Sequence, residues 1–460
     1  MRIGRRALAL GTTAFAATAG TAAAQERPAR REERAAERPP RQEGNQRRTR
    51  EAAAGGIWVA SWAASAHGPY PSGNPNAQPD QSFAFPEPSE GARDQSMRMM
   101  IRPDLWGRSM RVRFTNAFGT RPLVVADAFL GLQGMGGNLA AGTNAPITFG
   151  GQKRATIPAG ATLWSDAVEL GFVRERELAL LRGRRLAVSF HLPGTTGPMT
   201  WHAKSLTTSY VSPPGSGARG AEESDANYPY TTASWFFVDM LDVRAPAGTK
   251  VICCFGDSIT DGTNTTVNGD DRWPDTFSRI LHTRFGDRVS VVNAGIGGNR
   301  VQSPAQYDPA NPIPGGPSAL ARMERDVFQL SGLSAVIWMQ GINDFGHAES
   351  NATADQVIAG LREGVRRMRE RGLTVIGGTL TSALGFNGGH GTPEVDAKRR
   401  VVNVWIRLPG SFDAVADFDL ATRDPVAGGL LPPFIPNSTV GGPGDRLHPN
   451  RAGLMAMAGA

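Results

Sequence analysis

Apolar and polar residues alternate in short runs through the first half of the chain, from Gly55 to about Ala247. The clearest runs are IWVASWAAS (57–65), SMRVRFTN (109–116), LVVADAFLGL (123–132), RRLAVSFHLP (184–193) and SWFFVDMLDV (234–243). A period of two is typical of β-strands, and Gly, Pro, Asn and Asp separate the runs as turn residues. No stretch sustains a helical period for three turns. We therefore predict an antiparallel β-sandwich or jelly roll over residues 55–247.

From Lys250 onward, strand-like runs alternate with amphipathic helices. The expected strands are KVICCF (250–255), VSVVNA (289–294), SAVIWMQ (334–340), LTVIGGTL (373–380) and FDAVADFD (412–419). The expected helices lie near 273–285, 318–330, 352–371 and 394–408, and a last one begins at Asn450. This alternation predicts an α/β domain over residues 248–460, with a parallel sheet covered by helices on both faces. In such sheets ligands bind beyond the carboxyl ends of the strands.

The first 54 residues have a different character. Arg2, Arg5 and Arg6 precede the apolar segment ALALGTTAFAATAG, and AAA stands before Gln25. This order is typical of a signal peptide over residues 1–24, and it predicts a periplasmic or secreted protein. The main expectation is export by the Sec route, and a twin-arginine signal at Arg5-Arg6 is the alternative route. An uncleaved membrane anchor is the alternative to a cleaved signal peptide. Residues 25–54 hold nine Arg, six Glu and three Pro without aromatic residues, which predicts a disordered linker.

These two segments also account for most of the charge. The formal net charge is +7, of which nine Arg against six Glu in the linker give +3 and the three signal arginines another +3. About +1 remains for the folded part, so we expect no nucleic-acid partner. The only cysteines, Cys253 and Cys254, are adjacent in an expected strand. Their side chains point to opposite faces, so we expect two small buried residues and no disulfide.

Four polar clusters follow expected strands of the second half. Ser258 lies in FGDSITDG, where Gly256 permits a tight turn and the following residues open a helix. A serine in this place is exposed to a substrate, although Ser after Asp is also a plain helix N-cap. The segment NAGIGGNR (293–300) offers backbone N–H groups without a Cβ in the way, and a simple loop turn is the alternative.

The third and fourth clusters add an amide and an acid–imidazole pair. In MQGINDFGH, the side-chain amide of Asn343 is placed to donate to a developing oxyanion, although Asn is also common in turns. In GGPGDRLHPN, Asp445 precedes His448 by three residues, a spacing at which a carboxylate reaches the imidazole Nδ1–H. The Nε2 atom is then left to accept a proton from Ser258. A surface Asp and His in a loop is the alternative for this pair.

Taken together, these clusters resemble the four conserved blocks of the SGNH hydrolases, the GDSL-type esterase family. The matching segments are GDSIT, NAGIGGNR, GINDFG and DRLHPN, within residues 250–460, and Ile259 stands where the family name has Leu. The resemblance implies a three-layer, flavodoxin-like domain with Ser258 as nucleophile, His448 as general base and Asp445 orienting it. It further implies an oxyanion hole made of the Ser258 N–H, a glycine N–H and the Asn343 amide. Gly298 is the favoured glycine, and Gly297 stays open.

The first half is similar to a β-sandwich that precedes the hydrolase domain in exported bacterial relatives, some of which deacetylate polysaccharides. WVASWAAS and RVRFTNAFG carry that resemblance. It implies an exported serine esterase acting on carboxylic esters, acetyl groups on carbohydrate above all. The alternatives are a general short-chain esterase or lipase, and an inactive carbohydrate-binding protein.

No cofactor or metal is expected, because the chain has no His-Glu-x-x-His run and no paired Cys ligands. After the N-terminus no apolar run approaches eighteen residues, so we expect no stable membrane insertion once the signal is cleaved. His347 and His390 are expected in loops, where ordinary surface histidines are the main expectation and a place at the border of the cleft is the alternative. Trp273 and Trp338 are expected in the core.

Overall fold

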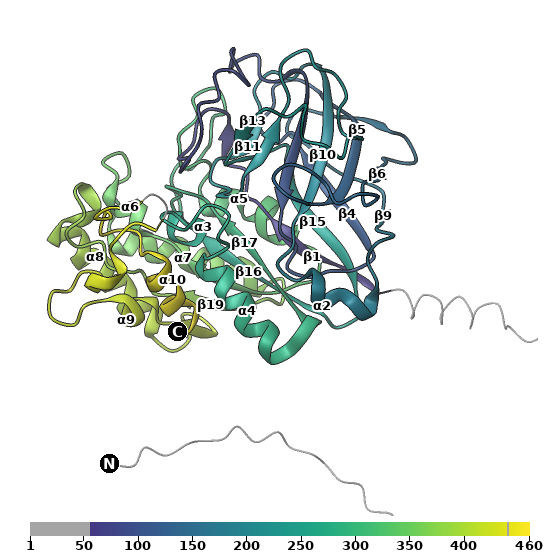
Figure 1. The fold of residues 1–460 in the computed structure, drawn as a ribbon. Coiled ribbons are helices and arrows are strands. Elements are labelled where there is room, and N and C mark those ends of the chain that lie inside the picture. The colour runs from purple at the N-terminus through teal and green to yellow at the C-terminus, as the bar shows by residue number, and fades with distance from the viewer. Residues whose placement is uncertain (1–55, 439–440) are drawn as a thin grey trace, which may run out of the picture. The chain divides into compact units, whose positions relative to one another are not determined.

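Two kinds of β-sheet divide the chain, antiparallel before residue 246 and parallel after it (Figure 1). The computed structural model describes residues 56–438 and 441–460. The predicted signal peptide (1–24) and linker (25–54) lie outside these residues. The predicted fold class is confirmed: an all-β region (57–245) is followed by a parallel-sheet α/β region (250–458).

The β region contains three antiparallel sheets within the described residues. The five-stranded sheet comprises β1 (Ile57–Ala63), β15 (Val238–Ala245), β4 (Ser109–Thr115), β8 (Thr162–Trp164) and β9 (Val168–Glu169). The seven-stranded sheet comprises β13 (Tyr230–Thr232), β12 (Ser209–Val211), β3 (Arg93–Ile101), β10 (Leu186–Thr195), β5 (Leu123–Leu132), β6 (Ala145–Ile147) and β7 (Arg154–Ile157). The three-stranded sheet comprises β14 (Trp235–Phe236), β11 (Thr200–His202) and β2 (Gly68–Pro69). Edge-to-face packing of Phe114 on Phe190, with ring centroids 5.4 Å apart, joins the two larger sheets.

The run expected as one strand at 234–243 is two strands of different sheets. Phe237 separates β14 from β15 and has a φ of +59°, a left-handed conformation that interrupts an extended segment. Both sides of the break are buried and apolar, so the hydrophobic pattern carries no sign of it. Strand β3 is an addition to the runs named from the sequence. The buried guanidinium of its Arg98 donates to Ser189 Oγ (2.9 Å) and Gly137 O (2.7 Å).

The α/β region is built on one parallel sheet in the described chain. Its strands, in spatial order, are β17 (Val289–Gly295), β16 (Lys250–Gly256), β18 (Leu333–Met339), β19 (Thr374–Gly378) and β20 (Ala414–Ala416). Its α-helices are α3 (Ser258–Asp261), α4 (Trp273–Phe285), α5 (Ala319–Met323), α6 (Ile342–Gly346), α7 (Ala354–Arg369), α8 (Pro393–Arg407), α9 (Phe418–Thr422) and α10 (Arg451–Ala458). Short helical turns complete the two regions: α2 (Leu178–Leu181), the 3-10 turns 175–177, 286–288, 389–391 and 432–434, and a π-turn at 324–328.

Local capping explains where several of these helices begin. The Thr353 hydroxyl and the Gln356 side chain form a capping box at the start of α7, and Asn450 accepts from two backbone N–H groups of α10. The expected helix at 318–330 continues beyond α5 only as the π-turn. The expected strand at 412–419 pairs over three residues before Asp417 caps α9. Trp273 and Trp338 are each 1% exposed and lie in the core as predicted.

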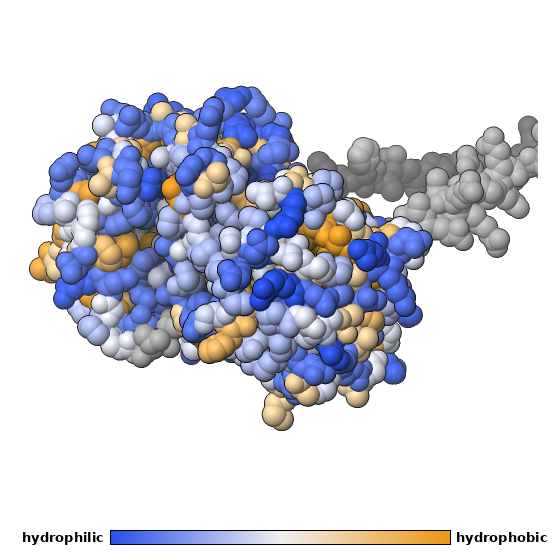
Figure 2. Space-filling model, turned by 90° about the horizontal axis from the view of Figure 1, so that it is seen from above, coloured by the Kyte–Doolittle hydropathy of each residue, from blue (hydrophilic) through white to orange (hydrophobic). Residues whose placement is uncertain are grey.

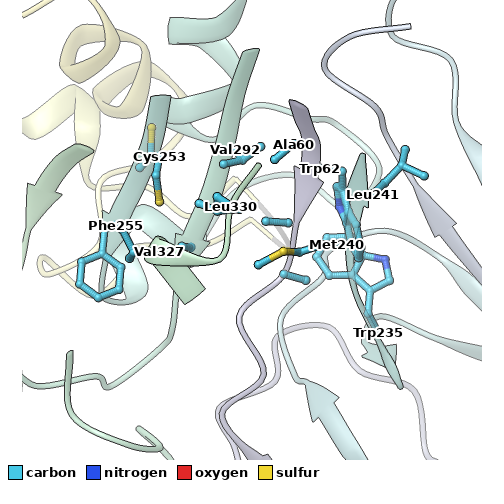
Figure 3. Packing of buried hydrophobic residues seen from close by; sticks show 14 of the residues in the cluster. Ala60, Trp62, Trp235, Met240, Leu241, Cys253, Phe255, Val292, Val327 and Leu330 are labelled. Carbon is cyan, nitrogen blue, oxygen red and sulfur yellow. The ribbon is translucent and has the colours of Figure 1, made fainter. Parts of the chain in front are cut away.

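One hydrophobic core runs through both regions. In Figure 3, Trp62, Trp235 and Met240 of the β region lie near Val292 and Leu330 of the α/β region, and all belong to the same buried cluster. Ser290 Oγ donates to Ala60 O over 2.7 Å, which ties β17 to β1. Residues 53–460 form one compact unit, and the boundary at residues 247 and 248 stays a prediction. Both cysteines are buried and unpaired, as expected.

The surface has no large hydrophobic area on the face drawn in Figure 2. Apolar side chains there occur in small groups among polar ones. No helix in residues 56–438 and 441–460 is long and apolar enough to cross a membrane.

Candidate active site

Ser258 is presented by a turn that only glycine permits at its start. Strand β16 ends at Gly256, and α3 begins at Ser258. A Cβ on Gly256 would lie 2.4 Å from Thr260 Oγ1 and 2.6 Å from Met339 O. The carboxylate of Asp257 caps α3 by accepting from the Ile259 N–H at 3.0 Å. The turn thus follows directly from GDSIT, and it fixes the serine at the carboxyl end of the central strands.

Ser258, His448 and Asp445 form a continuous hydrogen-bond chain. Ser258 Oγ lies 2.8 Å from His448 Nε2, and His448 Nδ1 lies 2.6 Å from Asp445 Oδ2. The carboxylate can only accept, so Nδ1 carries the hydrogen and Nε2 presents its lone pair to the hydroxyl. The structure therefore brings Ser258 together with Asp445 and His448, which lie 187 and 190 positions further along the sequence.

Asp445 is held ionised by its surroundings. Burial alone would raise the pKa of its carboxyl, but the hydrogen bond and charge of His448 and two backbone N–H groups outweigh burial and lower the pKa to about 2. Those N–H groups, of Leu447 and His448, each donate to Asp445 Oδ1 over 2.9 Å. The DRLH segment thus folds around its own carboxylate and sets the imidazole in place.

The loop after β17 lies against α6, which carries Asn343. Asn343 Nδ2 donates to Asn299 O over 3.0 Å, and both oxygens of the next residue, Asp344, accept from the Val301 N–H. Gly298 has a φ of +78°, which favours glycine. The Gly297 N–H already donates to Asp261 Oδ2 at 2.9 Å. Asn343 lies inside a short helix and not at the strand end, where the sequence had placed it.

His390 is a buried partner of Asn343 and not the surface residue that the sequence led us to expect. It is 8% exposed, and its Nε2 atom lies 3.1 Å from Asn343 Oδ1. The amide nitrogen of Asn343 faces the Asn299 carbonyl, so Oδ1 is the acceptor and His390 Nε2–H the donor. Burial lowers the pKa of His390 to about 4, with help from His347 and His448, and the ring is neutral at pH 7. His347, whose pKa is also lowered by burial, packs edge-to-face on it.

Two buried carboxyl groups lie beside the proposed site residues in the sequence, Asp257 before Ser258 and Asp344 after Asn343. Burial raises the pKa of each to about 7, against the backbone N–H groups that stabilise the charged form. The pKa of Asp257 is raised further by the charge of Asp344.

Side chains of the β region also reach the α/β loops. His202 Nε2 donates to Asp261 Oδ1 at 3.1 Å, and Lys204 Nζ donates to Thr263 Oγ1 at 2.6 Å. Burial alone would raise the pKa of Asp261, but the charges of His202, Lys204 and Arg272 lower it. Asn74 Nδ2 donates to Gly297 O at 3.0 Å. No motif of the first half pointed to these three residues, because their partners are more than fifty positions away.

The described residues contain no group of three or more His, Cys, Asp or Glu side chains that is arranged to hold a metal ion. The groups that meet at the site are a hydroxyl, an imidazole whose Nε2 faces that hydroxyl, an ionised carboxylate, and nearby backbone and amide donors.

Comparison with known proteins gives the following. Residues 254–455 match the GDSL-like lipase/acylhydrolase family. No curated protein matches the sequence significantly. Among solved structures, a GDSL-like lipase from Bacteroides thetaiotaomicron is 16% identical, covering 46% of this chain and 85% of its own, with a TM-score of 0.34. The acetylxylan esterase Axe2 from Geobacillus stearothermophilus is 25% identical, covering 46% of this chain and 91% of its own, with a TM-score of 0.33.

The family match spans β16 to α10, and it includes every segment that carries Ser258, Asn343, Asp445 and His448. It begins at Cys254 and so leaves the β region uncovered. The α/β region is therefore a GDSL-like lipase/acylhydrolase domain, and it supports a serine ester hydrolase.

Proposed function

We propose that Ser258, His448 and Asp445 are the catalytic triad of a carboxylic ester hydrolase. The hydrogen-bond chain from Ser258 Oγ through His448 to Asp445 Oδ2, at 2.8 Å and 2.6 Å, is the observation that supports this most directly. This geometry places Nε2 to take the serine proton.

In the first step, Ser258 Oγ bonds to the acyl carbon while its proton moves to His448 Nε2. The tetrahedral intermediate then collapses, the bond to the alcohol oxygen breaks, and Nε2 returns the proton to that oxygen. In the second step water repeats the sequence on the acyl-serine and releases the acid. Asp445 stays ionised and stabilises the imidazolium at each stage.

We assign the oxyanion hole to the Ser258 N–H, the Gly298 N–H and the Asn343 amide. Gly298 is preferred to Gly297 because the Gly297 N–H is already bound to Asp261. Asn343 Nδ2 gives one hydrogen to Asn299 O and keeps a second for the substrate oxygen. Neutral His390 fixes the orientation of this amide through its bond to Oδ1. Fixed donors of this kind stabilise the charge that develops in the transition state.

The proposed substrate is an acetyl or other short acyl ester of a carbohydrate. The loops around Ser258 support a polar alcohol: segments 256–264, 295–302, 340–351 and 443–450 of the described chain contribute none of the large exposed hydrophobic side chains. A general short-chain esterase is the second candidate, because the hydrogen-bond chain of Ser258, His448 and Asp445 does not itself select the alcohol. We further propose export, on the sequence of residues 1–24.

The test is hydrolysis of p-nitrophenyl acetate by the parental protein and by Ser258→Ala, with the labelling of Ser258 by a fluorophosphonate probe as a second readout. We expect Ser258→Ala to lose activity by at least about 10⁴-fold and to lose labelling. Parental rates in that variant would contradict the triad. Faster release of acetate from acetylated xylan than hydrolysis of p-nitrophenyl butyrate supports the carbohydrate substrate, and the reverse supports the general esterase. A parental protein that the fluorophosphonate probe does not label would favour the inactive carbohydrate-binding protein.

A further inference from the structure

A side chain of the β region is hydrogen-bonded to the loop that carries Gly298, the proposed oxyanion donor. Asn74 lies in the segment between β2 and β3, and its Nδ2 atom donates to Gly297 O at 3.0 Å across 223 positions of sequence. The Gly297 carbonyl and the Gly298 N–H belong to the same peptide unit. Asn74, by binding the Gly297 carbonyl, therefore acts on the peptide unit whose N–H is the proposed oxyanion donor.

Because the peptide unit is planar, the orientation of the Gly297 C=O fixes the orientation of the Gly298 N–H. In a trans peptide the C=O and the N–H point in opposite directions, and the plane turns only as a whole. A hydrogen bond that holds the Gly297 oxygen toward the β region thus holds the Gly298 hydrogen away from it. Without that bond, glycine at both positions leaves the plane free to rotate, because neither residue has a Cβ to limit its dihedral angles.

The preceding peptide is held as well. The Gly297 N–H donates to Asp261 Oδ2 at 2.9 Å, and Asp261 Oδ1 accepts from His202 of β11 at 3.1 Å. A Cβ on Gly297 would lie 2.6 Å from Lys204 Nζ, and one on Gly298 would lie 2.8 Å from Asn74 Nδ2. The loop is therefore packed against the β region at both glycines, and Asn74 makes the contact that sets the second peptide.

We propose that Asn74 is a positioning residue of the hydrolase, which orients the Gly297–Gly298 peptide so that the Gly298 N–H faces the oxyanion hole. This inference rests on the proposed function. It gives the β region a part in the reaction, through a side chain that the family match does not cover.

The effect of removing Asn74 falls mainly on kcat. The orientation matters most when the oxyanion forms, since the hole binds the transition state more strongly than the ester. Loss of a whole donor lowers kcat by about 10²–10³-fold, and a peptide that still samples the correct orientation loses less, about tenfold to hundredfold. KM should change little. Asn74 is exposed, so its truncation leaves the core intact.

The experiment compares Asn74→Ala and Asn74→Asp with Asn76→Ala, a control on the same segment. Asp has the size of Asn but brings an acceptor to the Gly297 carbonyl, so Asn74→Asp should be at least as slow as Asn74→Ala. We expect kcat on p-nitrophenyl acetate to fall in both, with KM, melting temperature and the fraction of sites titrated by fluorophosphonate retained. Phenylboronic acid, which forms a tetrahedral adduct with the serine, should bind both variants more weakly than the control.

Parental kcat in either Asn74 variant, or a loss of kcat matched by an equal loss of titrated sites, would overturn the inference. A failure of the proposed function has a different signature: the parental protein is then inactive, or Ser258→Ala is active.

Discussion

The two regions of this molecule contribute to the site in different ways. In the α/β region, Ser258 follows β16 and Asn343 follows β18 at one end of a parallel sheet. Asp445 and His448 do not directly follow a strand as expected, because α9 and the 3-10 turn at 432–434 stand between them and β20. The β region has no such edge. Its strands run antiparallel, so its loops emerge at both ends. The loop residue Asn74 and His202 of β11 reach the loops of the α/β region.

This difference teaches that the two regions divide framework from chemistry, but not completely. A parallel sheet collects loops at one edge, and chemistry can then be carried by short local motifs. The β region mainly supplies buried packing and ion pairs, and a few of its side chains, such as Asn74, contact the loops that carry the proposed site residues.

The largest expected effect is on the stability that the β region provides. Asp239 is bound by Arg113 through Nε–Oδ1 at 2.8 Å and Nη2–Oδ2 at 2.9 Å, and both side chains are buried. Asp239→Ala leaves an uncompensated buried guanidinium, which should lower the free energy of unfolding by about 3–5 kcal/mol. Denaturant unfolding measures this loss.

The matched control is Glu169→Ala, which removes the exposed partner of Arg108 and should cost less than about 1 kcal/mol. The kcat of Asp239→Ala per titrated site should remain parental, because Asp239 is bonded to no catalytic loop. A lower kcat per titrated site in Asp239→Ala would show that this ion pair of the β region affects the reaction as well as the stability.

The next largest effect is on kcat in the α/β region. Asn343→Ala removes a proposed oxyanion donor and should lower kcat by about 10²–10³-fold with a smaller change in KM. Steady-state hydrolysis of p-nitrophenyl acetate, scaled to fluorophosphonate-titrated sites, measures it. Asn351→Ala, an exposed amide on the same segment, is the control.

A variant of His390 extends this measurement, because His390 Nε2 is bonded to Asn343 Oδ1 and is expected to act through that amide. His390→Ala alone should lower kcat by about tenfold, the cost of a loosened amide. In the double variant with Asn343→Ala it should add nothing further. Additive losses would show that His390 acts on the reaction by another route.

The smallest predicted effect is the pH dependence of stability at the nucleophile turn. Burial raises the pKa of Asp257 from 3.8 to about 7, so the folded protein holds this proton more tightly than the unfolded chain. The stability gained in this way is full below pH 4 and is lost as the pH rises through about 7. Between pH 5 and pH 8 the loss is about 2–3 kcal/mol.

Asp257→Asn has no group to titrate there, so its free energy of unfolding should fall less over that interval. Urea unfolding of both proteins at several pH values measures the difference. Asp355→Asn, on the exposed first turn of α7, should leave the parental slope unchanged. If the free energy of unfolding changes equally with pH in the parental protein and in Asp257→Asn, the buried carboxyl of Asp257 is not the source of that change.

Much of the fold was predictable from local signals. Helix α4 has the bounds that periodicity gave, from Trp273 to Phe285, and Asn450 caps α10 as its sequence indicates. The break at Phe237 was not predictable, because the residues on both sides are apolar and only the pairing partners differ. The burial of Arg98 in β3 was not predictable either, because its guanidinium donates to the distant carbonyl groups of Gly137 and Ser224.

The sequence by itself determined the alternation of elements, the serine turn, and the carboxylate–imidazole spacing at 445 and 448, since each depends on residues within a few positions of one another. Only the tertiary structure decided that His390 binds Asn343 and that Asn74 binds Gly297, because these contacts join positions 47 and 223 residues apart. Such contacts depend on how sheets and loops pack, and a hydrogen-bonding side chain looks the same in the sequence whether its partner is water or a catalytic loop.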